Sequence, residues 1–146
     1  MWHGPALDDV LKDVTHAHAA ARPIPKAHTI WELVLHVTAW AEIARARLQG
    51  ERIADPTAAE DWQPAPASDS ATDPDSVPNL ELAWQHTLNR LIESHRELAD
   101  DARELDDEAL DSIVPGLEYR VSTLLQGVVE HGVYHGGQIA ILRKTL

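Results

Sequence analysis

The chain has 146 residues, 44% of them hydrophobic, with 24 Asp and Glu against 12 Lys and Arg and a net charge of −12. This length suits one domain, residues 1–146, and so acidic a surface repels phosphate backbones and anionic lipid, which argues against nucleic acid and membranes as partners. The chain has no cysteine, so disulfides and thiolate metal ligands are excluded, and thiol chemistry would need a thiol brought by a substrate or cofactor.

The first predicted helix runs from Pro5 to about Arg22. Proline suits the first turn of a helix, and Pro23 and Pro25 end this one. One stripe carries Leu7, Val10, Leu11, Val14 and His18. Because His18 lies on that stripe, we expect it to have a structural role, or one behind a metal ligand, rather than to bind metal directly.

The second predicted helix runs from about Thr29 to Leu48. Thr29 with Glu32 three residues later is typical of a capping box, and Gly50 suits the end of the helix. His36 lies at the edge of the apolar stripe, where a side chain can reach a neighbouring helix. Alone, it would be interpreted as a core or boundary histidine.

A long connection follows, from Glu51 to Pro78, and it holds five of the nine prolines. Loops of this length in compact domains are unusual and are often either functional or loosely ordered. Trp62 is a large apolar side chain within it. Two interpretations stay open: that the connection folds over the helices as a lid, or that Trp62 anchors it to the core.

The third predicted helix runs from Asn79, a plausible cap, to about Arg103. His95 lies on its apolar face and is therefore a rival candidate for a metal site. The acidic segment Asp100 to Asp111 is interpreted as a solvated face or a short helix at Asp106–Leu110. It lacks the spacing of a calcium-binding loop.

The fourth predicted helix starts at Ser122 or Thr123 and ends near Lys144. His131 and His135 lie in the middle of its apolar stripe, one turn apart. Buried imidazoles need partners, and one divalent ion would satisfy both rings at once. The alternative is a pair of core histidines bonded to carbonyl or hydroxyl groups.

Four amphipathic helices with one long Pro-rich connection predict an all-α fold, a four-helix bundle of the up-and-down or crossover type, of which up-and-down is our expectation. In such bundles, metal sites are built by side chains of facing helices. His36 therefore becomes a candidate third ligand beside His131 and His135.

Two blocks carry a family resemblance: HTIWELVLHVTAW at 28–40 and EYRVSTLLQGVVEHGVYHGGQIAILRK at 118–144. They resemble the DinB/YfiT-like metal-binding four-helix bundles of the DinB superfamily. The family's marks are a histidine in the middle of the second helix and an HxxxHxGQI signature on the last. The matching residues here are His36, His131, His135, Gly137, Gln138 and Ile139.

The resemblance implies a three-histidine metal site at His36, His131 and His135 with open positions for water. It also implies a homodimer, and enzymes that use a low-molecular-weight thiol, such as transferases and isomerases. Imidazole ligands suit zinc, nickel, copper and iron, and zinc or nickel is our expectation. Gln138 is predicted to bond a ligand or water, or to cap a core polar contact.

Two functional hypotheses from different classes follow. The first is a metal-dependent enzyme, a thiol S-transferase or a hydrolase, that acts on a small molecule; its catalytic residues are unknown. The second is a bundle that holds metal without catalysis, in binding or in a stress response. A third interpretation has the histidines bonded internally with no metal. With neither a signal-peptide pattern nor a long apolar run, we expect a cytoplasmic location.

Overall fold

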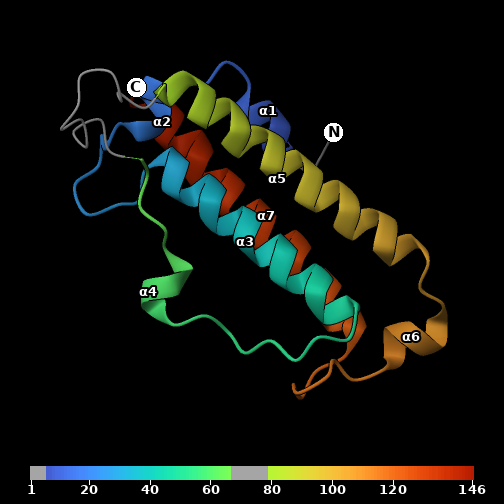
Figure 1. The fold of residues 1–146 in the computed structure, drawn as a ribbon. Helices are drawn as coiled ribbons and strands as arrows, with labels where there is room; N and C mark the ends of the chain where they lie inside the picture. Colours follow the sequence, from blue (N-terminus) through green and yellow to red (C-terminus); the bar gives the residue numbers. More distant parts are fainter. Residues whose placement is uncertain (1–5, 67–78) are drawn as a thin grey trace.

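The computed structural model describes residues 6–66 and 79–146, and within these ranges the chain forms α-helices and no β-strand (Figure 1). The all-α class predicted from the sequence is therefore confirmed. The elements in chain order are α1 (Leu7–Leu11), α2 (His16–Ala20), α3 (Ile30–Leu48), α4 (Ala58–Asp61), α5 (Leu80–Arg103), α6 (Asp107–Asp111) and α7 (Val121–Arg143).

The three long helices lie side by side, with α3 packed against both α5 and α7 (Figure 1). Their interface buries two indole rings completely, those of Trp31 and Trp84. Each indole N–H also has an acceptor: Trp31 donates to Thr87 Oγ1 at 3.1 Å, and Trp84 donates to the carbonyl of Val14 at 2.8 Å. The core is thus apolar, with its polar atoms satisfied.

The N-terminal segment differs from the prediction of one helix from Pro5 to Arg22, which is wrong for the described part. The chain breaks into α1 and α2 at Asp13, whose φ of 62° is incompatible with a continuing right-handed helix. Thr15 then caps α2 by accepting from the backbone N–H of His18 at 3.2 Å. Because α2 starts anew, it buries Ala19 and leaves His18 exposed.

The remaining helix starts follow the predicted caps closely. Thr29 and Glu32 form the reciprocal capping box at the start of α3, with bonds of 3.1 and 2.8 Å. The side chain of Asn79 accepts a hydrogen bond from the first turn of α5 at 3.0 Å. The last helix, α7, begins at Val121, one residue before the earliest predicted start at Ser122.

The long connection, predicted from Glu51 to Pro78, contains one short helix, α4, before residues 67–78, which lie outside the described residues. Thr57 and Glu60 start this helix with a second capping box, in which Glu60 Oε2 accepts from the backbone N–H of Thr57 at 2.9 Å. Residues 51–61 return along α3, so the end of α4 lies beside the middle of that helix, where Asp61 contacts His36.

No helix in the described ranges is both long enough and apolar enough to cross a membrane.

Two glycines of α7 have different surroundings. A Cβ built on Gly136 would lie 3.7 Å from Leu7 Cδ1, so this glycine faces the contact between α7 and α1. A Cβ on Gly132 would meet nothing within 4 Å. Gly136 thus allows a close approach between α7 and α1, whereas Gly132 leaves open space.

The exposed Gly137 of α7 provides a test of local helix energetics. A Cβ there meets nothing within 4 Å, so Gly137→Ala should raise the free energy of unfolding by roughly 0.5–1 kcal/mol through helix propensity alone. Gly116→Ala is the matched control, and it should destabilise because Gly116 has a φ of +83°. Denaturant unfolding measures both, and a destabilising Gly137→Ala would contradict the packing described for α7.

Candidate metal centre

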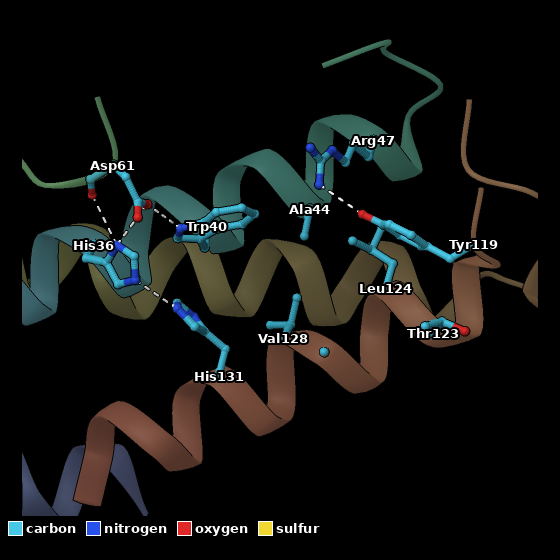
Figure 2. Close-up of a pocket in the computed structure, with 11 residues that line it drawn as sticks. His36, Trp40, Ala44, Arg47, Asp61, Tyr119, Thr123, Leu124, Val128 and His131 are labelled. Atoms are coloured by element: carbon cyan, nitrogen blue, oxygen red, sulfur yellow. Dashed lines mark hydrogen bonds and ion pairs between the residues drawn. The ribbon is translucent and has the colours of Figure 1, made fainter. Parts of the chain in front are cut away.

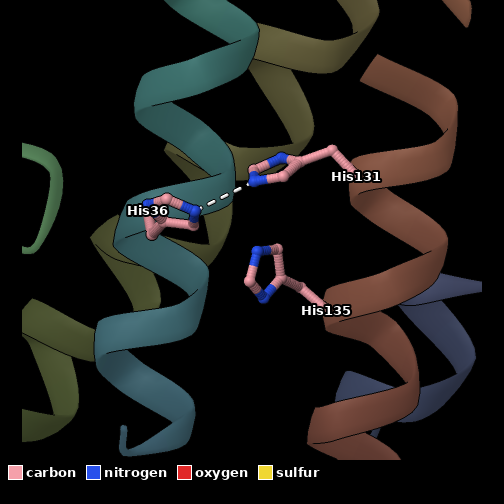
Figure 3. A group of neighbouring side chains, drawn as sticks. All are labelled: His36, His131 and His135. Carbon is pink, nitrogen blue, oxygen red and sulfur yellow. Dashed lines mark hydrogen bonds between the residues drawn. The ribbon is translucent and has the colours of Figure 1, made fainter. Parts of the chain in front are cut away.

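Three histidine side chains from two helices converge at one point: His36 from α3, and His131 and His135 from α7 (Figure 3). One nitrogen of each ring lies within 4.8 Å of the others. The Nε2 atoms of His36 and His131 are 2.9 Å apart. His36 and His135 are each only 5% exposed, while His131 is half-buried. The two histidines spaced i, i+4 on α7 thus meet the histidine at the edge of α3 across one helix interface.

The other nitrogen of two of these rings is bonded to an oxygen. Nδ1 of His36 lies 3.0 Å from Asp61 Oδ1 and 3.1 Å from the Asp61 carbonyl (Figure 2). Nδ1 of His135 lies 2.7 Å from Gln138 Oε1. Because these oxygens only accept, each Nδ1 carries the proton and donates it. Each Nε2 therefore carries a lone pair rather than a proton, the arrangement that metal-binding histidines use.

Asp61 was missed in the sequence analysis. Its Oδ1 also accepts from the indole N–H of Trp40 at 2.6 Å, so the carboxylate is held between α3 and the connection. No spacing relates Asp61 to His36, which stands 25 residues earlier. The available signal was the capping box at Thr57 and Glu60, which predicts that a helix starts just before Asp61.

Trp62 lies flat between two imidazole rings. Its ring centroid is 3.5 Å from that of His28 and 4.0 Å from that of His36, with interplanar angles of 6° and 7°. The connection is therefore anchored against a ligand candidate, and Trp62 covers one face of His36. Whether the whole connection acts as a lid stays a prediction, and its residues 67–78 lie outside the described ranges.

The surroundings of the site keep two rings neutral. Burial, followed by the neighbouring His135 and His36, lowers the pKa of His131 to about 4. Burial also lowers the pKa of His135, against the opposing effect of its bond to Gln138. At pH 7 these rings therefore offer lone pairs without first losing a proton, which favours metal binding.

The donor set fits a divalent ion. Zinc–nitrogen bonds of 2.0–2.1 Å in a tetrahedral site place two ligand nitrogens about 3.3 Å apart, close to the 2.9 Å between His36 and His131 Nε2. Three neutral imidazoles suit zinc, nickel, copper or iron equally. A set of three protein ligands is the composition of catalytic zinc sites, which keep one position open.

The rival candidates lie elsewhere. His18 is exposed on α2. His95 on α5 is bonded through Nδ1 to the carbonyl of Leu91 at 2.9 Å. Neither belongs to the group of converging ligand atoms. Gln138, predicted to bond a ligand or water, contacts His135, as expected for a cap on a polar contact; a cofactor contact stays a prediction.

A cavity of about 480 Å³ opens beside His36 and His131, between α3 and α7 (Figure 2). This size is within the range of small-molecule sites. His36, His131 and Asp61 line one end, and Arg47, Tyr119 and Thr123 line the other. The wall between these ends is formed by Trp40, Ala44, Leu124, Gly127 and Val128.

The lowered pKa of His131 predicts how the metal-free protein responds to acid. An exposed imidazole has a pKa of about 6.5, whereas His131 has one of about 4. Between these values the unfolded chain binds a proton that the folded chain does not, so stability falls as the pH falls from about 6.5 to about 4. Thermal melts with chelator present should show this fall and a shallower one in His131→Gln. Equal slopes in the two proteins would contradict the assignment.

The contact between Asp61 and His36 predicts an effect on metal affinity. Asp61→Ala removes the carboxylate that accepts from Nδ1 of His36. The ring is then freer to turn, so metal affinity should fall by roughly 10- to 100-fold. The control is Glu51→Ala, which removes an exposed carboxylate from the same connection and changes the net charge by the same amount. Calorimetric titration with zinc measures both variants. Equal losses of zinc affinity would show a general effect of charge and contradict a specific role of Asp61.

Comparison with known proteins agrees with this geometry. The family model of the DinB superfamily matches residues 2–139. No curated protein and no solved structure matched the chain. The match spans nearly the whole chain and includes all three histidines of the site, and it confirms the resemblance carried by the two sequence blocks. The chain belongs to the DinB superfamily.

Proposed function

We propose that the protein binds one divalent metal ion through Nε2 of His36, His131 and His135 and uses it for chemistry on a small molecule. One observation carries the proposal: three imidazole nitrogens converge, and two of their rings, those of His36 and His131, line the end of a cavity. Two of the rings are held in the ligating tautomer by Asp61 and Gln138. A structural site would have no need of an adjoining cavity and would close its coordination with a fourth protein ligand.

The chain's own residues supply position, orientation and access. Asp61 and Gln138 fix the two ring orientations, and Trp62 covers His36 from outside. The apolar wall of the cavity limits the water around a bound substrate. A divalent ion held there would lower the pKa of a thiol or water that binds it, or polarise a carbonyl group.

We favour a thiol as the nucleophile. The chain has no cysteine, so the thiol would come from a low-molecular-weight cofactor. Among the described residues, Asp61 is the one carboxylate that lines the cavity, and it is engaged by His36 and Trp40. A thiol whose pKa a bound metal ion lowered would lose its proton to solvent, so no separate base would be needed. The reaction would then be thiol transfer to an electrophile, with hydrolysis by activated water as the variant.

We also propose that α1 and α2 together stand in for the first helix of a four-helix bundle. In support of this, α1 packs against α7, and α2 packs against α3 and α5, so the split segment occupies the position beside the three long helices. A single domain, a homodimer and a small-molecule substrate remain part of the same proposal.

The alternative is a protein that holds metal without catalysis. The cavity beside the histidines favours the enzyme, since a storage or structural site gains nothing from it. The two functions differ in one measurable respect: only the enzyme hypothesis requires that a small thiol bind to the zinc-loaded protein in competition with water. Calorimetric titration with a simple alkyl thiol distinguishes them.

Metal analysis tests the proposal directly. Protein purified without a histidine tag should contain, or take up, close to one zinc or nickel ion per chain, and His36→Ala and His131→Ala should both lose it. His18→Ala and His95→Ala are matched controls that should retain it, because neither ring belongs to the group of converging ligand atoms. A parent protein that takes up neither zinc nor nickel would overturn the proposal and leave internally bonded histidines.

A further inference from the structure

The end of the cavity away from the histidines contains a buried arginine. Arg47 on α3 is 2% exposed, which is rare for this residue unless it is paired. It lines the cavity together with Tyr119 and with Thr123 of α7 (Figure 2). Thr123 precedes His131 by eight residues of the same helix, so the two ends of the cavity lie about 12 Å apart along α7.

The hydrogen bonds of Arg47 leave donors at this end. Nε and Nη2 both donate to the carbonyl of Ile53, at 3.1 and 2.9 Å, and Nη2 also donates to Asp55 Oδ1 at 2.7 Å. Nη1 donates to the Tyr119 hydroxyl at 3.1 Å. A guanidinium has five N–H groups, so one Nη1 hydrogen has no partner among the described residues.

Two hydroxyl groups complete this end of the cavity. Tyr119 Oη accepts from Arg47, so its own hydrogen is free to be donated to a ligand. Thr123, which is exposed, also lines this end, and neither of these hydroxyls donates to another described residue. Three donor groups, those of Arg47, Tyr119 and Thr123, therefore lie at one end of a cavity with an apolar wall.

We propose that these three groups bind the carboxylate of an elongated small molecule, whose apolar body fills the cavity and whose other end reaches the three histidines. The carboxylate of Asp61 lies at the histidine end, so an anionic group in the metal-free cavity is favoured at the Arg47 end. Asp55, 68% exposed, offsets part of the arginine charge from the outside. A ligand carboxylate adds charge-assisted hydrogen bonds at the inner side.

The inference deepens the proposed function and rests on it only for the end of the ligand that reaches the histidines. The substrate, or the thiol that reacts with it, would be an organic acid with an apolar chain between its reacting group and its carboxylate. The wall offers Ala44, Leu124 and Val128 to that chain. Gly127 leaves room for it, because a Cβ there would meet nothing within 4 Å.

The first test uses metal-free protein, so that its result does not depend on the metal. Octanoate is the probe, because its extended chain is slightly shorter than the separation of the two ends, and octanol is the uncharged control. Calorimetry should show octanoate binding about 10-fold more tightly than octanol. Equal affinities, or no binding of octanoate, would overturn the proposal.

Variants locate the carboxylate. Arg47 itself ties the connection to α3 and its loss endangers folding, so Tyr119→Phe and Thr123→Val are the informative changes. Each removes one hydroxyl and should reduce the preference for octanoate over octanol by about threefold or more. Ser122→Ala is the matched control, since Ser122 is an exposed hydroxyl of the same turn that does not line the cavity. An unchanged preference in the Tyr119→Phe/Thr123→Val double variant, folded by circular dichroism, would overturn the assignment.

A further variant tests the cavity, and a second probe separates this inference from the proposed function. Gly127→Leu should fill the cavity and abolish binding of both octanoate and octanol; full affinity in this variant would overturn the placement.

On zinc-loaded protein, mercaptooctanoate should bind more tightly than mercaptooctanol. If zinc does not load, the proposed function fails while the preference for octanoate in metal-free protein still stands.

Discussion

A buried imidazole has two nitrogens to satisfy, and His36 satisfies them on opposite sides. Its Nδ1 is bonded to Asp61 of the connection, and its Nε2 lies 2.9 Å from His131 of α7. One side chain of α3 thus joins the described part of the connection to the last helix. Leaving either nitrogen without a partner in this interior would cost on the order of 1–3 kcal/mol. The path of the connection and the placement of the histidines are therefore coupled.

The same connection is tied to α3 at a second point. Arg47, three turns beyond His36, bonds to Ile53 and Asp55 soon after the helix ends. Between Asp55 and Asp61 the chain runs back along α3, and the next residue, Trp62, stacks on His36. His36 and Arg47, the two α3 residues that hold the connection, also line the cavity between α3 and α7. The cavity therefore has an acceptor, Asp61, at one end and donors at the other, and this polarity follows from how the connection is held.

The helices themselves follow rules that act over a few residues. The apolar spacing and caps of α3, α5 and α7 were readable because helix start signals and side-chain periodicity are local. The prediction of one first helix was wrong for a reason that is also local. The apolar stripe continued through Asp13, but Asp13 adopts a positive φ and Thr15 caps a new helix. Both arrangements bury Val10, Leu11 and Val14, so the stripe alone could not distinguish them.

By itself, the sequence determined the long helices, the two-histidine face of α7, and His36 as a candidate partner. These depend on spacing within one helix and on a family pattern. Only the tertiary structure decided that His95 and His18 stay outside the site, that Asp61 holds His36, and that Arg47 shares a cavity with Tyr119. The physical reason is that such contacts join residues 25 to 95 positions apart in the chain. Their meeting depends on the path of a connection that has no periodicity of its own.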